Sequence, residues 1–493
     1  MSLALKPAGR DLHSSQAAIQ LAALISKMFL GAFMLAGGVI GDLYGRRRML
    51  LWGSGAALVA SFGAAVANST GMLVAARGLD GIANAALGPL SLALALAVFR
   101  PEEQSKVVSL YLGLSVLGVA FGPVIAGLLI QNFGWRIGFV LPALLAIVGG
   151  LGVFVLAPRE QPPVVRPRLD GLGVFMSVIG LLGIVYALVL ANTFSWMYPR
   201  TVQYLIIGSV SLVAFIWWER RARDPLIDLH IFENRTATLA LITAGTFGLI
   251  LGGMILPLLY FLQSVYGLTP IAATLRMTPL VLSAAICSPL IGLMMNRAGP
   301  RKVIALGGLL MALGSAIIAV GSIDSSHAVL LVSLCLIGPG YLAVITAVAD
   351  VILSSLPKER AGSAAAVNGA AIQIGGAFGI VIFVSIFLSA ARPEYFGRLA
   401  SLGIPVDELR TMTRTWRNAM QDSFATGYRV LPEGVRDQFK VAWQYGFTAG
   451  INRIFTVSAV LSFICSALIW FGIKPASQEK IDEHRYEPAP NTT

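Results

Sequence analysis

Charged residues are scarce in this chain. Of its 493 residues, only 12% are charged and 56% are hydrophobic, whereas roughly 25% of the residues in a soluble domain are charged. Apolar runs of about twenty residues or more recur from residue 16 to residue 473, and each can cross a hydrocarbon core of roughly 30 Å. The composition excludes a water-soluble protein and predicts an all-α polytopic membrane protein.

Residues that carry catalytic or metal-binding chemistry are also few. The cysteines Cys287, Cys335 and Cys465 lie far apart in apolar segments, without the spacing of a disulfide framework or a metal site. The four histidines fall in loops or tails, and no phosphate-binding loop of the GxxxxGK type occurs. We therefore expect no enzyme, no metal, no cofactor and no ATP-driven pump.

The net charge of +12 does not point to nucleic acid, because the basic residues are scattered through short loops. Thirteen membrane helices are predicted, at about 17–41, 49–67, 72–98, 106–130, 137–157, 170–191, 202–218, 237–262, 271–295, 303–322, 328–353, 363–390 and 448–473.

Lys and Arg are concentrated in every second loop between the predicted helices. One side includes Arg46, Arg100 and Arg220, while the opposite short segments hold only four basic residues: Lys6, Arg10, Arg136 and Arg200. Because cytoplasmic loops are richer in Lys and Arg, the first side is predicted to be cytoplasmic. The C-terminus is then inside and the N-terminus outside. The outer segment 391–447 carries further basic residues, but long translocated loops follow this rule weakly.

An internal repeat divides the chain into two related halves. A glycine-rich basic motif near residue 40 recurs 254 residues later. Its residues Gly38, Asp42, Gly45, Arg47 and Arg48 correspond to Gly292, Asn296, Gly299, Arg301 and Lys302. Pro101 and Pro357 are separated by 256 residues, and Gly118 and Gly122 recur 257 residues later as Gly375 and Gly379. Two homologous halves with a substrate path between them are typical of secondary transporters.

The repeat predicts four regions. They are an N-terminal helix bundle at 1–157, an inserted helix pair with its flanking cytoplasmic loops at 158–235, a C-terminal bundle at 236–473 that includes the outer loop 391–447, and a cytoplasmic tail at 474–493.

A tight basic turn joins the first two predicted helices, and its motif residues are Gly38, Asp42, Gly45, Arg46, Arg47 and Arg48. The glycines allow close backbone approach, and the acid can pair with a helix N-terminus or an arginine. We expect a gating latch that breaks when the halves rock. The second copy has Asn296 in place of the acid, with Arg301 beside it, so its latch should be weaker. The alternative is a turn that only enforces topology.

Arg77 and Asp80 lie three residues apart within an apolar helix, on one face and within pairing reach. A charge inside the membrane costs about 2.5 to 3.5 kcal/mol on insertion scales, so such a pair is a functional candidate. We favour a proton-coupling role for Asp80 beside Arg77. Static neutralisation of the arginine is the alternative.

Four further motif residues follow in the next helix: Gly118, Gly122, Pro123 and Gly127. They form a GxxxGPxxAG run, in which the proline bends the helix and the small residues permit close packing.

Polar side chains in other helices are candidates for the substrate path. Lys27 is about ten residues, or roughly 15 Å, from either end of its helix, so it should face a cavity or an acid, with Asp80 or a substrate carboxylate as partner. Backbone carbonyls are the alternative partner. Asn368 and Gln373 either line the path or hydrogen-bond a neighbouring helix. Arg276, near an outer helix end, is expected to be structural.

Together these motifs resemble the fourteen-helix drug/proton antiporter family of the major facilitator superfamily. The turn from Gly38 to Arg48 has the spacing of the superfamily's signature loop. The run Arg77-Gly78-Leu79-Asp80-Gly81 resembles the motif of proton-coupled members, in which a Gln usually replaces Asp80. The glycine–proline run resembles the antiporter signature of exporters, with Ala126 in place of a second glycine.

The resemblance implies two pseudo-symmetric six-helix bundles plus the inserted pair. It implies a proton-coupled antiporter in a bacterial inner (plasma) membrane that exports drugs or other small amphiphilic molecules. Its partners would be the substrate, protons and the lipid bilayer, with a periplasmic adaptor protein as a further candidate. The rival functions are transport of one endogenous metabolite and a membrane receptor without transport. The departure is at the start, where Met1 to Pro7 stand in place of the family's complete first helix.

Overall fold

The computed structural model describes residues 2–14, 16–158, 170–193, 196–222, 233–321, 327–354, 361–401 and 433–472, and these ranges contain helices and no strand. The helices are α1 (Ser2–Asp11), α2 (Gln16–Tyr44), α3 (Arg46–Ala65), α4 (Thr70–Val98), α5 (Pro101–Phe133), α6 (Ile137–Leu156), α7 (Gly171–Thr193), α8 (Pro199–Glu219), α9 (Arg235–Ser264), α10 (Pro270–Ala298), α11 (Pro300–Ala319), α12 (His327–Ser354), α13 (Ala361–Ser401) and α16 (Glu433–Gly472).

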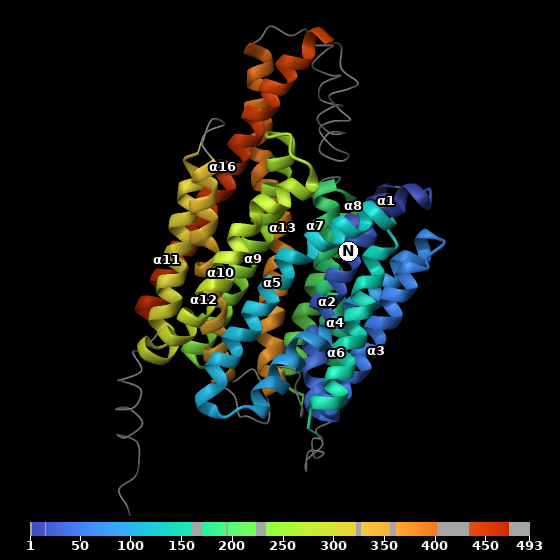
Figure 1. Cartoon of the computed structure of the whole chain (residues 1–493), viewed down its shortest axis with the longest axis vertical. Helices are drawn as coiled ribbons and strands as arrows, with labels where there is room; N and C mark the ends of the chain where they lie inside the picture. The colour runs from blue at the N-terminus through green and yellow to red at the C-terminus, as the bar shows by residue number, and fades with distance from the viewer. Residues whose placement is uncertain are drawn as a thin grey trace, which may run out of the picture.

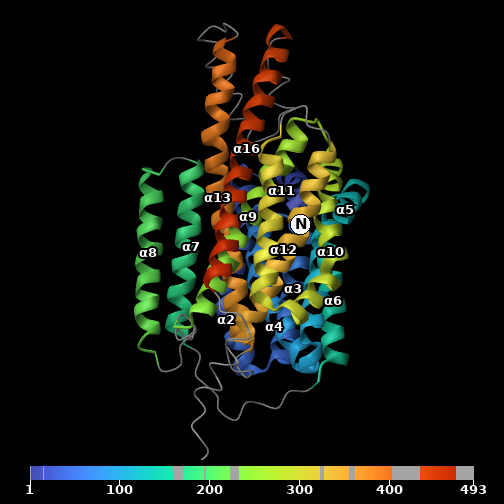
Figure 2. The ribbon, with the colours of Figure 1, turned by 90° about the vertical axis from the view of Figure 1, so that its left-hand side faces the viewer.

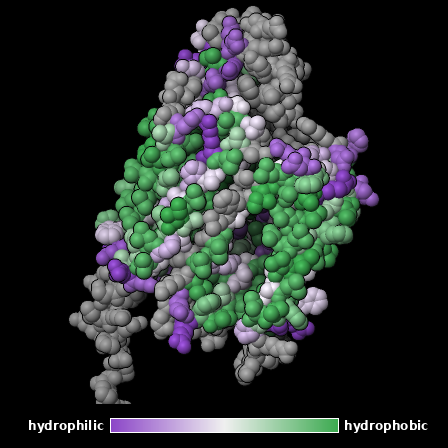
Figure 3. Space-filling view, viewed as in Figure 1, coloured by the Kyte–Doolittle hydropathy of each residue, from purple (hydrophilic) through white to green (hydrophobic). Residues whose placement is uncertain are grey.

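The outer surface of the helices is apolar. Among the described segments, ten helices are long and apolar enough to cross a membrane. Val148 and Val155 of α6 are 67% and 73% exposed, and apolar residues cover much of the face shown in Figure 3. A surface of this kind is stable against lipid rather than water. The chain is a multi-pass membrane protein.

The helices form two groups that lie side by side (Figure 1). The N-terminal half contains α2 to α6, and the C-terminal half contains α9 to α13 together with α16. Helices α7 and α8 stand beside these groups as a pair (Figure 2), with α7 packed against α2 and α13. The halves meet where α2 packs against α13 and α5 against α10. The predicted two bundles and inserted pair are confirmed.

Turns with related conformations mark one end of both halves. Gly45, between α2 and α3, has φ of 93°, and Gly299, between α10 and α11, has φ of 77°. Only glycine adopts such values without strain, which explains why the repeat keeps glycine at both positions. We call this end, with Arg46 to Arg48 and Arg301, the basic end.

Helices α13 and α16 are longer than the sequence predicted. Residues 391–401 and 433–447 are helical, although they were expected to belong to an outer loop, and the two helices project beyond the rest of the bundle (Figures 1 and 2). Phe439, Trp443 and Phe447 recur every fourth residue along one face of α16. Tyr395 of α13 packs against Phe439 and Trp443 with ring centroids 6.0 and 6.4 Å apart. We call this projecting side the hairpin end.

Candidate functional site

The predicted contact between Arg77 and Asp80 is confirmed. Arg77 Nη1 lies 2.7 Å from Asp80 Oδ2, and both side chains are 9% exposed. Ser26 Oγ of α2 donates to the same oxygen at 2.9 Å, and Asn84 Nδ2 donates to Asp80 Oδ1 at 2.9 Å. Arg77 Nε also donates to the carbonyl of Ala22 at 3.4 Å. The carboxylate therefore has three donor groups from two helices.

Glycines of α4 bring the two helices into this contact. A Cβ added at Gly81 would lie 2.3 Å from the carbonyl oxygen of Ser26, and one at Gly78 would lie 3.1 Å from Phe29. Such separations exclude any side chain at Gly81 without movement of the backbone. The glycines on either side of Asp80 thus allow Ser26 to reach its carboxylate.

Protonation of Asp80 would disturb this arrangement. An ionised carboxylate only accepts hydrogen bonds, whereas a protonated one also donates. The added proton would lie among donors from Arg77, Ser26 and Asn84. The Ser26 hydroxyl can rotate to accept it, whereas the Arg77 guanidinium can only donate. Removing one member of a buried ion pair generally costs about 3–5 kcal/mol. Protonation would therefore weaken the pairing of Asp80 with Arg77 and reorient the Ser26 hydroxyl that joins α2 to α4.

A polar groove borders the acid. It has a volume of about 460 Å³ between α3, α4, α5 and α6, and its polar lining includes Ser54, Ser61, Asp80, Asn84, Ser91 and Tyr111. Ser91 Oγ and Tyr111 Oη lie 2.7 Å apart and join α4 to α5. Asp80 thus has an approach from outside the helix bundle.

Lys27 lies beside Ser26 on α2, but its side chain is exposed. The described ion pair of Asp80 is with Arg77, so the predicted pairing of Lys27 with Asp80 is not found among the described contacts. Lys27 instead lies within electrostatic range of Arg77. Asp80 neutralises Arg77, so the positive charge that an anion would meet here is that of Lys27.

The arginines of the repeated basic turns bind within their own halves. Arg47 of α3 donates from Nη2 to the carbonyl of Phe154 on α6 at 2.7 Å, and lies 5.6 Å from the centroid of that ring. Arg301 of α11 makes the matching contacts with Trp470 of α16, at 4.8 Å from the ring centroid. These contacts tie α3 to α6 and α11 to α16.

The other residues of the predicted gating turns are less informative. Arg46 Nη1 donates to the Ala93 carbonyl at 3.5 Å, and Arg48 and Asn296 are exposed. The surroundings of Gly38 and the side chain of Asp42 lie outside what the structure describes. The latch formed by Asp42 stays a prediction.

Gly118 and Gly122 of the predicted antiporter motif have open space beside them in the part of the chain that the structure describes. No heavy atom lies within 4 Å of a Cβ added at Gly118 or Gly122. At the repeat-related positions, added Cβ atoms at Gly375 and Gly379 would each lie 2.0 Å from a carbonyl oxygen of α9. Gly127 is buried, and the side chain of Pro123 lies outside the described residues. The first two glycines of the motif are therefore open, whereas the matching glycines of the C-terminal half are packed.

The predicted path residues of α13 differ in exposure. Asn368 is 8% exposed, and its Oδ1 has no hydrogen-bond partner among the described residues. The next residue faces the other half, because a Cβ at Gly369 would lie 2.3 Å from Met34 Cε of α2. Gln373 is exposed. Asn368 therefore holds a buried acceptor near the contact between the halves.

Two contacts of Asp80 were not predicted from the sequence. Asn84 follows Asp80 by four residues, so helix spacing alone could have indicated it. Ser26 comes from another helix, and its only sequence signal is the pair Gly78 and Gly81.

Known proteins with similar sequences are transporters and resistance proteins. They include the multidrug resistance protein Stp of Mycobacterium tuberculosis (strain CDC 1551 / Oshkosh), 30% identical over 81% of this chain and 74% of that protein. The puromycin resistance protein pur8 of Streptomyces alboniger is 32% identical, over 79% of this chain and 78% of that protein. The tetracenomycin C resistance and export protein of Streptomyces glaucescens is 26% identical, over 97% of this chain and 89% of that protein.

Solved structures share the fold. The human organic anion transporter MFSD10 (TETRAN) matches with a TM-score of 0.58 at 14% identity, over 92% of this chain and 83% of that chain. The proton:xylose symporter XylE matches with a TM-score of 0.57 at 12% identity, over 96% of this chain and 91% of that chain. The sequence profile of the Major Facilitator Superfamily matches residues 1–380. This chain belongs to the Major Facilitator Superfamily, whose members are transporters.

Proposed function

We propose that this chain exports drugs or other small amphiphilic molecules in exchange for protons. The observation that carries the proposal is the buried carboxylate of Asp80, held by Arg77, Ser26 and Asn84 at the wall of a polar groove. Buried intramembrane acids with specific partners are typical of proton relays. The resistance proteins among the relatives support drugs as the substrate class.

The coupling follows from the helices that the cluster joins. A proton on Asp80 weakens its attraction to Arg77 and forces the donor from Ser26 to reorient. Ser26 belongs to α2, which packs against α13 of the other half. Proton binding on α4 therefore biases the contact between the halves, and downhill proton entry drives substrate out.

The orientation follows from charge. Arg46, Arg47, Arg48 and Arg301 gather at the basic end, and loops rich in arginine remain on the cytoplasmic side. The basic end then faces the cytoplasm of a bacterial inner membrane, together with the C-terminus. The hairpin end faces outward, where a periplasmic adaptor protein could reach it.

A second candidate function has one observation in its favour. Lys27 is exposed, while Asp80 neutralises Arg77, and the positive charge of Lys27 would suit a single anionic metabolite better than a cationic drug. Dedicated transport of such a metabolite is the alternative to broad drug efflux. Lys27→Gln discriminates between them, because its effect should fall on anionic substrates alone.

The test is dye efflux from vesicles that contain this chain under an imposed proton gradient. We expect a protonophore to abolish efflux, and Asp80→Asn to reduce it by at least about five-fold, the lower range of typical coupling energies. Asp350→Asn is the matched control, because Asp350 is an acid in an apolar helix of the other half. Full gradient-driven efflux by Asp80→Asn would exclude Asp80 as the coupling site.

Comparing a cationic with an anionic dye tests the substrate class in the same vesicles. Efflux of both dyes supports broad drug export. If neither dye moves while the protein is folded, the dedicated-metabolite function gains support.

A further inference from the structure

A second titratable contact lies at the hairpin end of the C-terminal half. Arg276 Nη1 of α10 and His327 Nδ1 of α12 are 2.9 Å apart. A guanidinium keeps its charge and can only donate hydrogen bonds. Nδ1 of His327 must therefore accept, which requires a neutral imidazole with its hydrogen on Nε2. The contact is incompatible with a doubly protonated ring.

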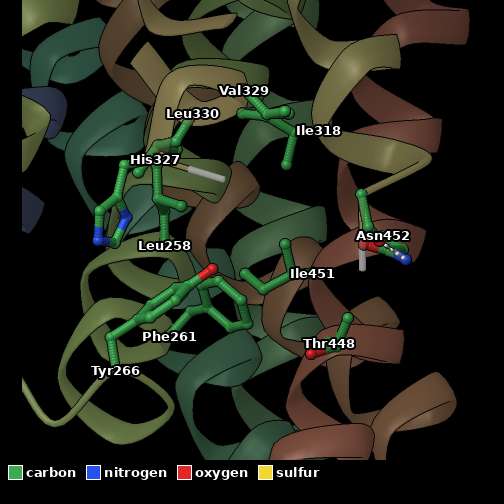
Figure 4. Close-up of a pocket in the computed structure, with 11 residues that line it drawn as sticks. Leu258, Phe261, Tyr266, Ile318, His327, Val329, Leu330, Thr448, Ile451 and Asn452 are labelled. Carbon is green, nitrogen blue, oxygen red and sulfur yellow. Dashed lines mark hydrogen bonds between the residues drawn. The ribbon is translucent and has the colours of Figure 1, made fainter. Parts of the chain in front are cut away.

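Water has room to reach this histidine. His327 and Tyr266 lie on one side of a small pocket, with Thr448 and Asn452 on the other (Figure 4). The pocket has a volume of about 40 Å³, enough for a few water molecules, since one needs roughly 10–15 Å³ on this measure. The His327 side chain is itself exposed. A proton can therefore arrive at the ring from the hairpin end.

The surroundings offer no described carboxylate to a protonated His327. Arg276 faces it from α10, and the Tyr266 ring lies 5.6 Å away in the connection between α9 and α10. Helix α16 contributes Thr448 and Asn452, which are neutral. Glu394 borders a different pocket together with Arg453, and residues 322–326 lie outside the described ranges. A proton on His327 would place two cations in direct contact.

Repulsion between Arg276 and a protonated His327 would act on α10, and this helix lies at the contact between the halves. Helix α10 packs against α5 of the N-terminal half as well as against α12. Imidazole is the side chain whose unperturbed pKa, about 6.5, lies in the physiological range. Acid at the hairpin end would thus loosen α10 from α12. Because α10 also contacts α5, this change would lie next to the contact between the halves.

We propose that His327 is a second proton-binding site, separate from Asp80, whose protonation breaks the contact with Arg276 and favours opening at the hairpin end. The physiological direction rests on the proposed function, in which this end faces the acidic side of the membrane. The site gives an exporter a sensor of outer pH. Protons would then open the path on the side where they are most abundant.

The test measures the distance between α10 and α12 at the hairpin end. Spin labels are placed on the lipid-facing positions L275C and L331C, which are 50% and 52% exposed, after replacement of the three native cysteines. Double electron–electron resonance on the protein in nanodiscs compares about pH 8 with about pH 5, on either side of the imidazole range. We expect acid to raise the population of the longer distance at least about five-fold, within the usual range of coupling.

Two variants should abolish this response for different reasons. In His327→Gln the side-chain oxygen accepts from Arg276 at every pH, so the short distance should persist in acid. In Arg276→Gln no cation faces the protonated ring, so acid should produce no further change. His13→Gln is the matched control, because His13 lies at the hairpin end of the N-terminal half, and it should keep the response. A response that survives in His327→Gln, or is absent from the parent protein, would overturn the proposal.

Asp80→Asn separates this proposal from the coupling mechanism. We expect it to retain the acid-dependent distance change while losing gradient-driven efflux. If efflux persists and the distance change is also present, the coupling role of Asp80 is wrong and the sensor stands. If Asp80→Asn abolishes the distance change, His327 is not an independent site and the proposal fails.

Discussion

Asp80 differs from an ordinary paired acid because its donors come from two helices. Arg77 and Asn84 belong to its own helix, whereas Ser26 belongs to α2. The helix contact that brings Ser26 into reach depends on Gly81, where a Cβ would lie 2.3 Å from a backbone oxygen. The chemistry of the acid and the packing of the helices are therefore linked through one position.

Gly81→Ala should separate α4 from α2. The added carbon cannot fit against backbone, so we expect a loss of about 1–3 kcal/mol in stability, as for other overpacked sites, together with weaker proton-driven efflux. Gly71→Ala on the same helix is the control, because nothing lies within 4 Å of its added Cβ. Thermal unfolding in detergent and dye efflux measure both effects. Equal stability of the two variants would show that the contact is not tight.

Asp11 provides a pH-dependent contact outside the membrane-spanning helices. Hydrogen bonds from Trp135, at 3.0 Å, and Arg136, at 2.9 Å, lower the pKa of Asp11. Because its pKa is lower in the folded protein, the contact stabilises the fold above about pH 4 and loses this effect as the pH falls further. The carboxylate is exposed, so the effect should be small.

Asp11→Asn should therefore lower the unfolding temperature slightly at neutral pH, and the difference from the parent protein should shrink below about pH 4. Glu394→Gln, which removes the exposed ion pair with Arg398, is the comparison for a surface charge. A difference for Asp11→Asn that stays constant with pH would contradict the assignment.

The sequence predicted the pair Arg77 and Asp80, because helical spacing alone brings residues three apart together. It could not predict that Lys27 would be exposed, since the rotation of α2 against α4 depends on packing. The contact between Arg276 and His327 was missed for a similar reason. The two residues are 51 positions apart and meet only when α10 and α12 pack together.

At the scale of helices, the repeat-related glycines of α5 and α13 have different surroundings. The α13 glycines pack against the backbone of α9, which is possible only without a side chain. The same two positions on α5 have open space beside them. Identical residues in the two halves thus carry different constraints.

Alanine at the two related positions should have opposite effects. Gly375→Ala would place its Cβ 2.0 Å from the Gly245 oxygen, so we expect destabilisation by about 1–3 kcal/mol. In Gly118→Ala the added Cβ has no heavy atom within 4 Å. We therefore expect no loss of stability, and a gain of up to about 1 kcal/mol from the better helix propensity of alanine. Thermal unfolding in detergent compares the stability of the two variants with that of the parent protein. Equal destabilisation would show that a partner packs on Gly118 in solution.

Most helices could be predicted because their apolar runs match the thickness of a membrane. The ends of α13 and α16 could not, because these helices continue through charged sequence beyond the apolar runs. Their helical extension depends on aromatic packing between them, such as Tyr395 with Phe439. Hydropathy does not report contacts of this kind.

At the scale of the whole molecule, the proposed orientation in the membrane rests on the distribution of arginine. Tyr44 at the basic end is 57% exposed, and Asn68 is exposed between α3 and α4 at the opposite end. In intact cells, a membrane-impermeant maleimide should label Asn68→Cys and leave Tyr44→Cys unlabelled until the membrane is opened. The reverse pattern would place the basic end outside and invert the direction assigned to transport.

The two halves were predictable because the basic turn and the glycine spacing recur at nearly constant separations. Their meeting surfaces were not, since the repeat describes what the halves share rather than how they face each other. The placement of α7 and α8 beside the bundle likewise follows from packing of α7 on α2 and α13.

The unequal packing of the two glycine-bearing helices has a mechanical consequence. In the C-terminal half, α9 and α13 touch backbone to backbone, and a body joined in this way resists bending. In the N-terminal half, α5 has open space at the same positions and a groove beside it. A contact of the same kind does occur in that half, between α2 and α4, where Gly81 approaches the Ser26 carbonyl. Each half therefore has a helix pair joined through glycine, and in the N-terminal half that pair also carries Asp80, so a shift of one helix against the other would change the contacts of the acid.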